Sequence, residues 1–509
     1  MRATIIVCFL LLTQAAGTLA PAAGSQFRAS YVAGTSDFRG QPMGGTELMN
    51  IVAHEGKLYA GVGYWEDVAG RDRRPGAQVV VRDGPDAPWR ADRSFPGTLR
   101  MDSLRSFTFT TDGRGRRITP VSMLLAAPGN AVSGDLSVWS RDDATGMWTE
   151  MVLARLGRTA KGQIRALGFH HDSVTGVDDV FAGAGLYSGE GIGIFHGVYD
   201  PTAPGRIQWD PTPEFTDYRG RPMAFAEADG VLHVTSLGAM YRRSDGPAPS
   251  WIRVFSYDRR LIANNSGLRG LTAIPNPSGH GQVLLVALEG KASRIYRIDP
   301  AKKYKAVVEL DIVGFLRQQW KTQNRLYVIP AYNDMPVVPD PQNGHSVLLI
   351  GLQAHSPQPG KETSAWYLVR HSDARYELHA IAAIAEPKRS NPALVAVRAI
   401  AISPFPADAG RVVYFGGYDC NSKPAHDTAW MYEVGITDVL GSDRLPLRRR
   451  AGNGKPSPLK HAAHGPKPPA EAGGAGPSKP QADTDPFPMS HALTPPAVPA
   501  RNTRSAAES

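Results

Sequence analysis

The stretch Leu58-Tyr59-Ala60-Gly61-Val62-Gly63 is short, apolar and closed by glycine, and six similar stretches follow it along the chain. They are Met123–Ala127, Val180–Gly185, Leu232–Gly238, Val283–Gly290, Val347–Leu352 and Val412–Gly417. Each comes after an earlier apolar stretch and a turn, and is followed by a further strand that usually carries an aromatic residue and ends in an Asp-containing turn. A unit of four short strands that recurs every roughly 40–60 residues is typical of a β-propeller.

The earlier apolar stretch of each unit fits the first strand of a propeller blade. These first strands are Leu48–His54, Ser106–Thr110, Arg165–Phe169, Met223–Ala228, Leu271–Pro275, Leu326–Ala331 and Val397–Ile402. Both sets of strands are continuously apolar or small, which indicates burial on both faces between neighbouring sheets. We therefore predict an all-β fold and a seven-bladed β-propeller, with a six-bladed ring as the alternative.

The two ends of the repeat array complement each other. The seventh unit shows only three strands and stops near Gly435, whereas Phe27–Val32 is a strand without a unit of its own. The stretch Ser36–Met43 also resembles Thr216–Met223, which joins the third unit to the fourth. We expect Phe27–Val32 to supply the missing fourth strand and to close the ring, because closure removes exposed sheet edges.

The N-terminal segment indicates export. Residues 1–23 combine a basic residue, Arg2, with an apolar run from Ile5 to Leu12 that is too short to span a membrane. This pattern predicts a signal peptide and a secreted or periplasmic protein without a membrane span. Its removal leaves Cys420 as the one cysteine, so we expect no internal disulfide. The propeller, residues 24–440, then depends on burial for its stability, and we expect a monomer.

The C-terminal tail, residues 441–509, carries most of the net charge. From Arg444 onward it holds 10 Lys or Arg, 4 Asp or Glu and 13 of the 42 prolines, so it contributes +6 of the formal net charge of +9. Such a composition predicts a disordered, proline-rich basic segment. Because the high pI belongs to the tail, it does not predict nucleic-acid binding by the propeller.

Arginines recur where first strands begin. Leu104-Arg105-Ser106-Phe107 and Ile164-Arg165-Ala166-Leu167 share one pattern with Leu268-Arg269-Gly270-Leu271 and Val397-Arg398-Ala399-Ile400, and Arg325 precedes Leu326 similarly. First strands line the central channel of a propeller, so these guanidinium groups would meet at its mouth. They could bind an anion, since the planar fork suits carboxylate, sulfate or phosphate. Alternatively, each could pair with a carboxylate of the adjacent blade.

The loops after the second strands carry aromatic and acidic residues on the same face. These candidate ligand-binding residues are Trp65, Glu66, Asp67, Tyr187, Glu190, Glu289, His355, Tyr418 and Asp419. Aromatic faces beside carboxylates suit a sugar, because rings stack on its apolar face while acids bind hydroxyl groups. The acids could also supply paired-carboxylate catalysis, although no spacing identifies the pair. Ordinary polar loops remain the alternative.

The sequence predicts neither a metal site nor a cofactor. His170-His171-Asp172 with Asp178-Asp179 has metal-ligand residue types, but it falls in the turn between a first and a second strand, on the opposite face, where we expect a surface hairpin. Phosphate-loop, dinucleotide, calcium-loop and HExxH fingerprints do not occur in the sequence.

Three hairpins resemble the Asp-box of sialidases and related secreted propellers. They run from Asp83 to Trp89, from Asp142 to Trp148 and from Asp245 to Trp251, one residue longer than the usual box. Within the repeat itself, we expect each Asp to cap its turn and each Trp to fill the space between sheets. The resemblance implies a six-bladed propeller whose arginine triad holds a substrate carboxylate, to which Arg105, Arg165, Arg269 and Arg398 are loosely similar.

Together, these observations predict a secreted propeller binding module that recognises an anionic small molecule or an acidic glycan at an arginine-rich channel mouth. A glycan-active, sialidase-like hydrolase or lyase is the alternative. A scaffold that binds a protein partner is a further alternative.

Overall fold

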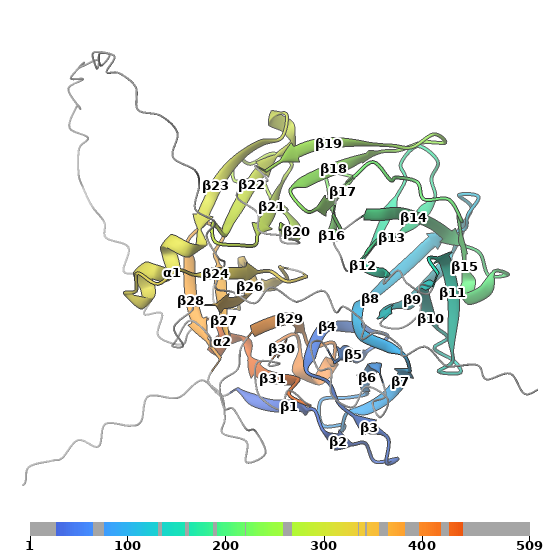
Figure 1. Cartoon of the computed structure of the whole chain (residues 1–509), viewed down its shortest axis with the longest axis horizontal. Coiled ribbons are helices and arrows are strands. Elements are labelled where there is room, and N and C mark those ends of the chain that lie inside the picture. Colours follow the sequence, from blue (N-terminus) through green and yellow to red (C-terminus); the bar gives the residue numbers. More distant parts are fainter. Residues whose placement is uncertain are drawn as a thin grey trace, which may run out of the picture.

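The computed structural model arranges its strands as seven blades around one centre (Figure 1). It describes residues 27–64, 76–130, 135–157, 162–186, 191–218, 220–257, 267–333, 335–341, 344–355, 365–381, 396–418 and 427–440. In each blade the strands pair antiparallel from the centre outward, and the first and last blades are joined into one eight-stranded sheet by pairing between β30 (Val412–Tyr418) and β4 (Glu47–His54). The predicted all-β, seven-bladed propeller is confirmed.

The blades follow one another in chain order. Blade 1 contains β4 (Glu47–His54), β5 (Lys57–Gly63), β6 (Ala77–Arg82) and β7 (Arg90–Phe95), and blade 2 contains β8 (Thr98–Thr111), β9 (Arg117–Asn130), β10 (Asp135–Arg141) and β11 (Trp148–Arg155). Blade 3 contains β12 (Gly162–His171), β13 (Asp178–Leu186), β14 (Gly191–Tyr199) and β15 (Ile207–Trp209). Blade 4 contains β16 (Pro222–Ala228), β17 (Val231–Ser236), β18 (Ala239–Ser244) and β19 (Ser250–Ser256).

The second half of the ring continues this order. Blade 5 contains β20 (Leu268–Pro275), β21 (Gln282–Leu288), β22 (Arg294–Asp299) and β23 (Lys305–Asp311). Blade 6 contains β24 (Tyr327–Pro330), β25 (Val337–Pro339), β26 (Ser346–His355), β27 (Trp366–Arg370) and β28 (Tyr376–Ala380). Blade 7 contains β29 (Ala396–Ile402), β30 (Val412–Tyr418), β31 (Trp430–Gly435) and β1 (Arg28–Val32), and a small hairpin of β2 (Thr35–Ser36) and β3 (Pro42–Met43) follows β1.

The N-terminal strand closes the ring, as predicted. β1 pairs antiparallel with β31 in a register that places Arg28 opposite Glu433 and Val32 opposite Trp430. The blue β1 and the orange β31 lie side by side in Figure 1, although they are about 400 residues apart in sequence. Phe27, just before β1, is 2% exposed and packs against Phe415 of β30. Blade 7 is therefore complete only when the two ends of the repeat array meet.

The core lies between blades. Second strands are buried along nearly their whole length because a neighbouring blade covers each face, and Leu58, Val180 and Leu285 are fully buried. Burial of such a side chain stabilises the fold by roughly 1.5–3 kcal/mol. The continuous apolar runs in the sequence thus reflect strands enclosed on both faces.

Two first strands differ from the prediction. β8 begins at Thr98, eight residues before the predicted Ser106, because polar residues at its start still pair with β9 as far as Asn130. In blade 6, the expected strand Leu326–Ala331 is interrupted after Pro330, and pairing with β26 resumes at β25. Ala331 adopts a positive φ of 46°, so the chain turns out of the sheet towards the centre of the ring at this point.

The described residues also include two α-helices, which the repeat pattern does not predict. α1 (Ile312–Trp320) follows β23, begins with a side-chain cap from Asp311, and buries Ile312, Val313 and Leu316. α2 (Ile436–Val439) ends the described propeller. Single 3₁₀ turns occur at Pro204–Arg206, Pro300–Lys302 and Pro406–Asp408. Within the described part of the chain, neither helix has the length and apolar character needed to cross a membrane.

Candidate functional site

Three of the predicted arginines converge on one tyrosine at the centre of the ring. The guanidinium carbons of Arg165, Arg269 and Arg398 lie 4.7, 4.7 and 3.6 Å from the centroid of the Tyr332 ring. They come from blades 3, 5 and 7, and their exposed fractions are only 2%, 6% and 7%. The sequence pattern of an arginine near the start of a first strand therefore brings these residues together in space.

A β-bulge at the start of each of these strands explains this placement. The pairing register shifts between Ile164 and Ala166 in β12, which leaves Arg165 as the extra residue. The same shift surrounds Arg398 in β29, and a wider one in β20 contains Arg269. Because a bulge re-aims the side chain of its extra residue, the repeated irregularity directs these arginines to one place.

Tyr332 reaches the arginines through the interruption of blade 6. The backbone N–H of Gly270 donates to the carbonyl of Ala331 at 2.9 Å, and a Cβ added at Gly270 would lie 2.7 Å from the Cβ of Ala331. Glycine is thus required for this close approach. The following Asn333 accepts a 2.7 Å hydrogen bond from Arg165 Nη2 and donates to the carbonyl of Met49 in blade 1. The Tyr332–Asn333 segment therefore bridges blades 1, 3, 5 and 6.

The centre holds more positive than negative groups. Arg100 and Arg221 interact electrostatically with the same site, so that the arginine cluster consists of Arg100, Arg165, Arg221, Arg269 and Arg398. Three carboxylates accompany it. Arg100 pairs with Asp102 at 2.7 Å and with Glu47 at 3.2 Å, and Arg269 pairs with Glu289. Among these described groups, the cluster carries a net charge of plus two when Tyr332 is neutral.

The excess of positive charge changes the ionisation of the tyrosine. Burial alone would raise the pKa of Tyr332, but Arg100, Arg398 and Arg165 favour the phenolate and lower the pKa to about 7. Burial, together with the neighbouring Arg269 and Arg100, also lowers the pKa of Arg221 to about 10. Both pKa values fall for the same reason: several positively charged guanidinium groups share a buried site, which favours the phenolate of Tyr332 and disfavours the charged form of Arg221.

Several polar atoms at the centre have no hydrogen-bond partner among the described residues. They are Arg165 Nε, Arg269 Nη1, Glu47 Oε2 and both amide atoms of Gln163. An unsatisfied buried polar group costs roughly 1–3 kcal/mol, and more when it is charged. Unpaired N–H groups beside a net positive charge are what an anion with several oxygen atoms would satisfy.

The structure places the other predicted residues differently. Arg105 lies in the middle of β8 and donates to the carbonyl of Leu104, because β8 begins earlier than predicted. The bulge at the start of β8 carries Asp102 instead, and Arg100 is the β8 arginine beside Tyr332. Arg325 is exposed just before β24. The prediction that Arg105 stands at the start of a first strand is therefore wrong.

The loop residues are only partly described. Glu289 is buried, and it accepts hydrogen bonds from Arg269 and, at 2.8 Å, from the Tyr327 hydroxyl. His355 and Tyr418 are the last residues of β26 and β30. Trp65, Glu66, Asp67, Tyr187, Glu190 and Asp419 lie outside the described residues, and so does Cys420. The aromatic and acidic loop site stays a prediction.

Sequence reasoning missed several residues of the centre. Arg221 falls within Thr216–Met223, a stretch that was recognised only as a linker between units. Glu47 is the first residue of β4, and Arg100 lies near the start of β8. The pattern of an arginine at the start of a first strand would have identified Arg100 if the predicted strand had begun at Thr98. Tyr332 has no repeat equivalent, so its position depends on where the first strand of blade 6 is interrupted.

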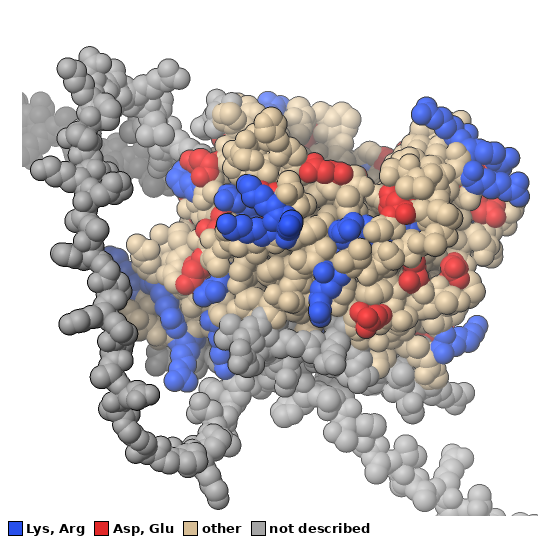
Figure 2. Space-filling model, turned by 90° about the horizontal axis from the view of Figure 1, so that it is seen from above, with Lys and Arg blue, Asp and Glu red and all other residues tan. Residues whose placement is uncertain are grey.

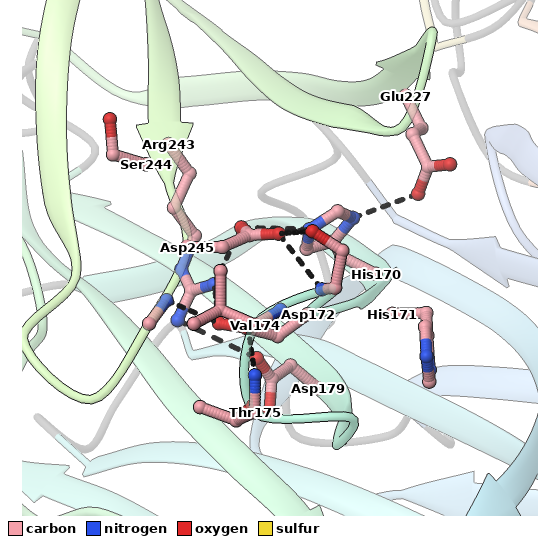
Figure 3. A network of polar contacts seen from close by, with 12 residues as sticks. His170, His171, Asp172, Val174, Thr175, Asp179, Glu227, Arg243, Ser244 and Asp245 are labelled. Carbon is pink, nitrogen blue, oxygen red and sulfur yellow. Dashed lines mark hydrogen bonds and ion pairs between the residues drawn. The ribbon is translucent and has the colours of Figure 1, made fainter.

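Adjacent blades are joined by other arginines, on the third strands. Arg243 of β18 donates to Asp172 and Asp245 at 2.9 and 3.1 Å (Figure 3). It also donates to Glu214 at 2.9 Å. Equivalent contacts to the preceding blade join Arg82 to Glu433, Arg141 to Asp92 and Arg370 to Glu309. Inter-blade ion pairs therefore involve the third-strand arginines, and at the centre Arg100 pairs with Glu47 of blade 1, whereas Arg269 pairs with Glu289 of its own blade.

His170 belongs to this inter-blade network. It is 1% exposed and lies between Glu227, 2.8 Å from Nδ1, and Asp245, 3.0 Å from Nε2 (Figure 3). His54 contacts Ser106 and Asp143 in the same way between blades 1 and 2. The expectation of a surface hairpin is thus wrong for His170, because the next blade covers its ring. In the described ranges no group of three or more His, Cys, Asp or Glu is arranged to hold a metal ion.

The Asp-box-like hairpins have mixed roles. Asp142 caps its turn as predicted, accepting from the backbone N–H of Thr145 at 2.8 Å. Asp83 instead pairs with Lys57 and Arg90, and Asp245 binds His170. The indole N–H of Trp148 donates to Asp92 of blade 1, so this Trp both fills the space between sheets and contributes a polar contact.

Charges are mixed on the outside of the ring. On the face shown in Figure 2, Lys and Arg side chains form small separate groups with Asp and Glu between them. A nucleic-acid surface needs a continuous basic stripe. This face therefore agrees with the expectation that the basic pI does not come from the propeller.

Comparison with known proteins gives the fold alone. No family model matches the sequence, and no curated protein matches it. Among solved structures, the fucose-specific lectin from Aleuria aurantia is 12% identical over 66% of this chain and 96% of its own, with a TM-score of 0.37. The Dos1 propeller is 12% identical over 79% and 81%, with a TM-score of 0.38. An α-L-arabinofuranosidase from Fusarium graminearum is 10% identical over 77% and 94%, with a TM-score of 0.34.

Proposed function

We propose that this protein is a propeller-based binding module that recognises an anionic small molecule or an acidic glycan at the arginine cluster. The observation that carries the proposal is the convergence of five guanidinium groups around Tyr332. Five guanidinium groups share the site with three carboxylates, and Arg165 Nε and Arg269 Nη1 have no partner among the described residues. A bound carboxylate, sulfate or phosphate offsets the charge and accepts these hydrogen bonds.

Ionisation of Tyr332 leaves donors at the centre for an external anion. With a pKa of about 7, the phenolate supplies at most one negative charge at neutral pH. The phenolate also faces three arginines through its ring, whereas Asn333 and backbone carbonyls occupy only some of the donors of Arg165. An anion with several oxygens therefore has both charge and donors to bind.

Binding to acidic and neutral glycans tests this proposal. The mature chain without residues 444–509 is titrated with N-acetylneuraminic acid, glucuronic acid and a heparin hexasaccharide, and with glucose and maltohexaose as neutral probes. Arg165→Gln with Arg269→Gln should weaken binding of the acidic probe at least tenfold. The matched control, Arg105→Gln with Arg325→Gln, removes the same charge outside the cluster and should change affinity less than twofold.

Equal losses in the two double variants would reduce the binding to generic electrostatics, and no loss in the cluster variant would contradict the site. Arg165→Lys, which keeps the charge but not the fork, separates charge from bidentate geometry. Thermal unfolding of each variant is measured alongside, so that a loss of fold is not taken for a loss of binding.

A glycan-active hydrolase or lyase is the second candidate function. It is favoured by the lowered pKa of Tyr332, since a phenolate near neutral pH can act as a base or a nucleophile. Turnover of acidic oligosaccharides by the wild type, lost in Tyr332→Phe with binding retained, would support catalysis. Unchanged turnover in Tyr332→Phe would contradict a role for Tyr332. We further propose that the chain is exported after removal of residues 1–23 and acts as a monomer.

A further inference from the structure

A second hollow lies away from the channel, between blades 3 and 4. Its volume is about 620 Å³, within the roughly 300–1,000 Å³ of typical ligand pockets. One wall comes from β18 and β19, which lie at the outer edge of blade 4 (Figure 1). Another part of the lining is the segment 215–218, which leaves blade 3. It is held against β14 because the backbone N–H of Ile194 donates to the carbonyl of Phe215 and the N–H of Glu214 donates to the carbonyl of Ile194. We call this hollow the blade 3–4 pocket.

Five of the eleven residues that line the pocket are aromatic. They are Phe215, Tyr218, Tyr241, Trp251 and Tyr257. Phe215 is stacked on Trp251 at 15° with centroids 5.7 Å apart, and its edge meets Tyr241 at 5.1 Å. Because these two parts of the lining belong to different blades, the assembled ring creates a surface that neither blade has alone.

The rings are fixed in place by polar contacts at their far ends. The indole N–H of Trp251 donates to Glu214 at 2.7 Å, and Glu214 is in turn held by Arg243 of the inter-blade network. The Tyr218 hydroxyl donates to the carbonyl of Ala184 at 2.8 Å. The aromatic side chains are therefore preorganised, so ligand binding loses little conformational entropy in ordering them.

The mouth of the pocket carries one acidic and one basic side chain. Asp217 and Arg253 are both exposed and both line the pocket, and Arg253 stands directly opposite Tyr241 in the β18–β19 pairing. The carboxylate accepts hydrogen bonds and the guanidinium donates them. The rim is thus close to neutral, in contrast to the net positive arginine cluster.

We infer that the blade 3–4 pocket binds a neutral sugar ring of an oligosaccharide. The apolar face of a pyranose stacks on aromatic rings, and its hydroxyl groups can donate to Asp217 and accept from Arg253. A proline-rich segment, such as the tail of this chain, fits the rings equally well. It would offer carbonyl acceptors to Arg253 but few N–H donors to Asp217, so the pair of rim charges favours the sugar.

This inference does not rest on the proposed function. None of the residues that line the pocket belongs to the arginine cluster, and the two sites attract ligands of different charge. The chain would then hold a neutral sugar at the edge of the ring and an anion at its centre, which suits a glycan with both kinds of residue.

Titration calorimetry with neutral oligosaccharides tests the pocket. The probes are maltohexaose, cellohexaose, xylohexaose and mannohexaose, each titrated into the wild-type mature chain. The double variant Asp217→Ala with Arg253→Ala changes only exposed side chains and should weaken binding of the best probe at least tenfold. Ile252→Ala, an exposed apolar neighbour on β19, is the matched control and should bind as the wild type. Phe215→Ala should abolish binding, with its fold checked by thermal unfolding.

The outcomes separate the alternatives. Arg165→Gln with Arg269→Gln should leave neutral-sugar binding unchanged, which distinguishes this site from the proposed anion site. Failure of all four probes to bind, or equal binding by the double variant, would overturn the inference. Binding of a synthetic peptide of residues 484–498 in place of any sugar, lost in the double variant, would also overturn it and assign the pocket to the proline-rich tail.

Discussion

The guanidinium carbon of Arg398 lies 3.6 Å from the centroid of the Tyr332 ring, which puts a cation directly over a phenol at the centre of the propeller. Arg165 and Arg269 approach the same ring from two other blades. Cation–π contacts and the shared charge couple four blades through one side chain. The chemistry of the centre therefore depends on the ionisation of Tyr332.

Tyr332 should ionise far below an ordinary tyrosine. Burial opposes the phenolate, but the arginines lower the pKa from 10 to about 7. Phenolate absorbance of the folded protein should show a step near pH 7 that is absent in Tyr332→Phe. Arg398→Gln removes a stabilising cation, so the step should move to higher pH. A wild type without any step below pH 9 would contradict this assignment.

The same shift should make stability depend on pH. The folded-state pKa of this acid lies below the unfolded value, so its stability contribution is complete above pH 10 and is lost as the pH falls through about 7. Between these limits, the free energy of unfolding should rise by up to about 1.4 kcal/mol per pH unit relative to Tyr332→Phe. Denaturant unfolding of both proteins at several pH values measures this difference.

Arg243→Ala should destabilise the propeller strongly. Arg243 is buried and holds Glu214, Asp172 and Asp245 between blades 3 and 4, so its loss leaves buried carboxylates uncompensated. The expected cost is about 3–5 kcal/mol in the free energy of unfolding. Arg242→Ala, the next residue on β18 and only half-buried, serves as the control and should cost less than about 1 kcal/mol. Equal losses would contradict a special role for the network.

Phe27→Ala should test closure of the ring. Phe27 is 2% exposed and packs on Phe415, so truncation leaves a cavity where the N-terminal strand joins blade 7. We expect a loss of about 3–5 kcal/mol. Thr35→Ala, at an exposed position of β2, is the control. A Phe27→Ala protein as stable as the wild type would show that β1 contributes little to closure.

Gly63→Ala should displace Arg100 and thereby disturb the arginine cluster. A Cβ at Gly63 would lie 2.2 Å from Arg100 Cα, so β8 must move away from β5. We expect a loss of about 1–3 kcal/mol and weaker binding of acidic probes. Gly84→Ala is the control because its Cβ would meet only Ala87, at 4.0 Å. Crystal structures or amide exchange of β8 would locate the displacement.

Much of the fold followed from local pattern. The apolar, glycine-closed second strands such as Val180–Gly185 need two neighbouring sheets to bury both faces, and that requirement alone predicts the ring of blades. The count of three strands in the last unit predicted that Phe27–Val32 completes blade 7. The first strand of blade 2 was placed too late because the polar start of β8 has no apolar signal.

The centre was only partly predictable. Arg165, Arg269 and Arg398 share a local motif whose bulge re-aims them, so their convergence could be read from the repeat. Arg105 shares the motif but not the bulge, and the register of β8 puts Asp102 and Arg100 at the centre instead. The register of a strand is set by pairing along its whole length, and a four-residue motif does not reveal that pairing.

The sequence by itself determined the number of blades, the strand that closes the ring and three of the central arginines, because each is written in a local periodic pattern. Only the tertiary structure decided that Tyr332 lies among those arginines and that Arg243 and His170 join blades. It also decided that Phe215 stacks on Trp251 in the lining of a pocket. These relationships connect residues from different blades. The residues come close together only when the ring closes, and a local sequence pattern does not encode that distance.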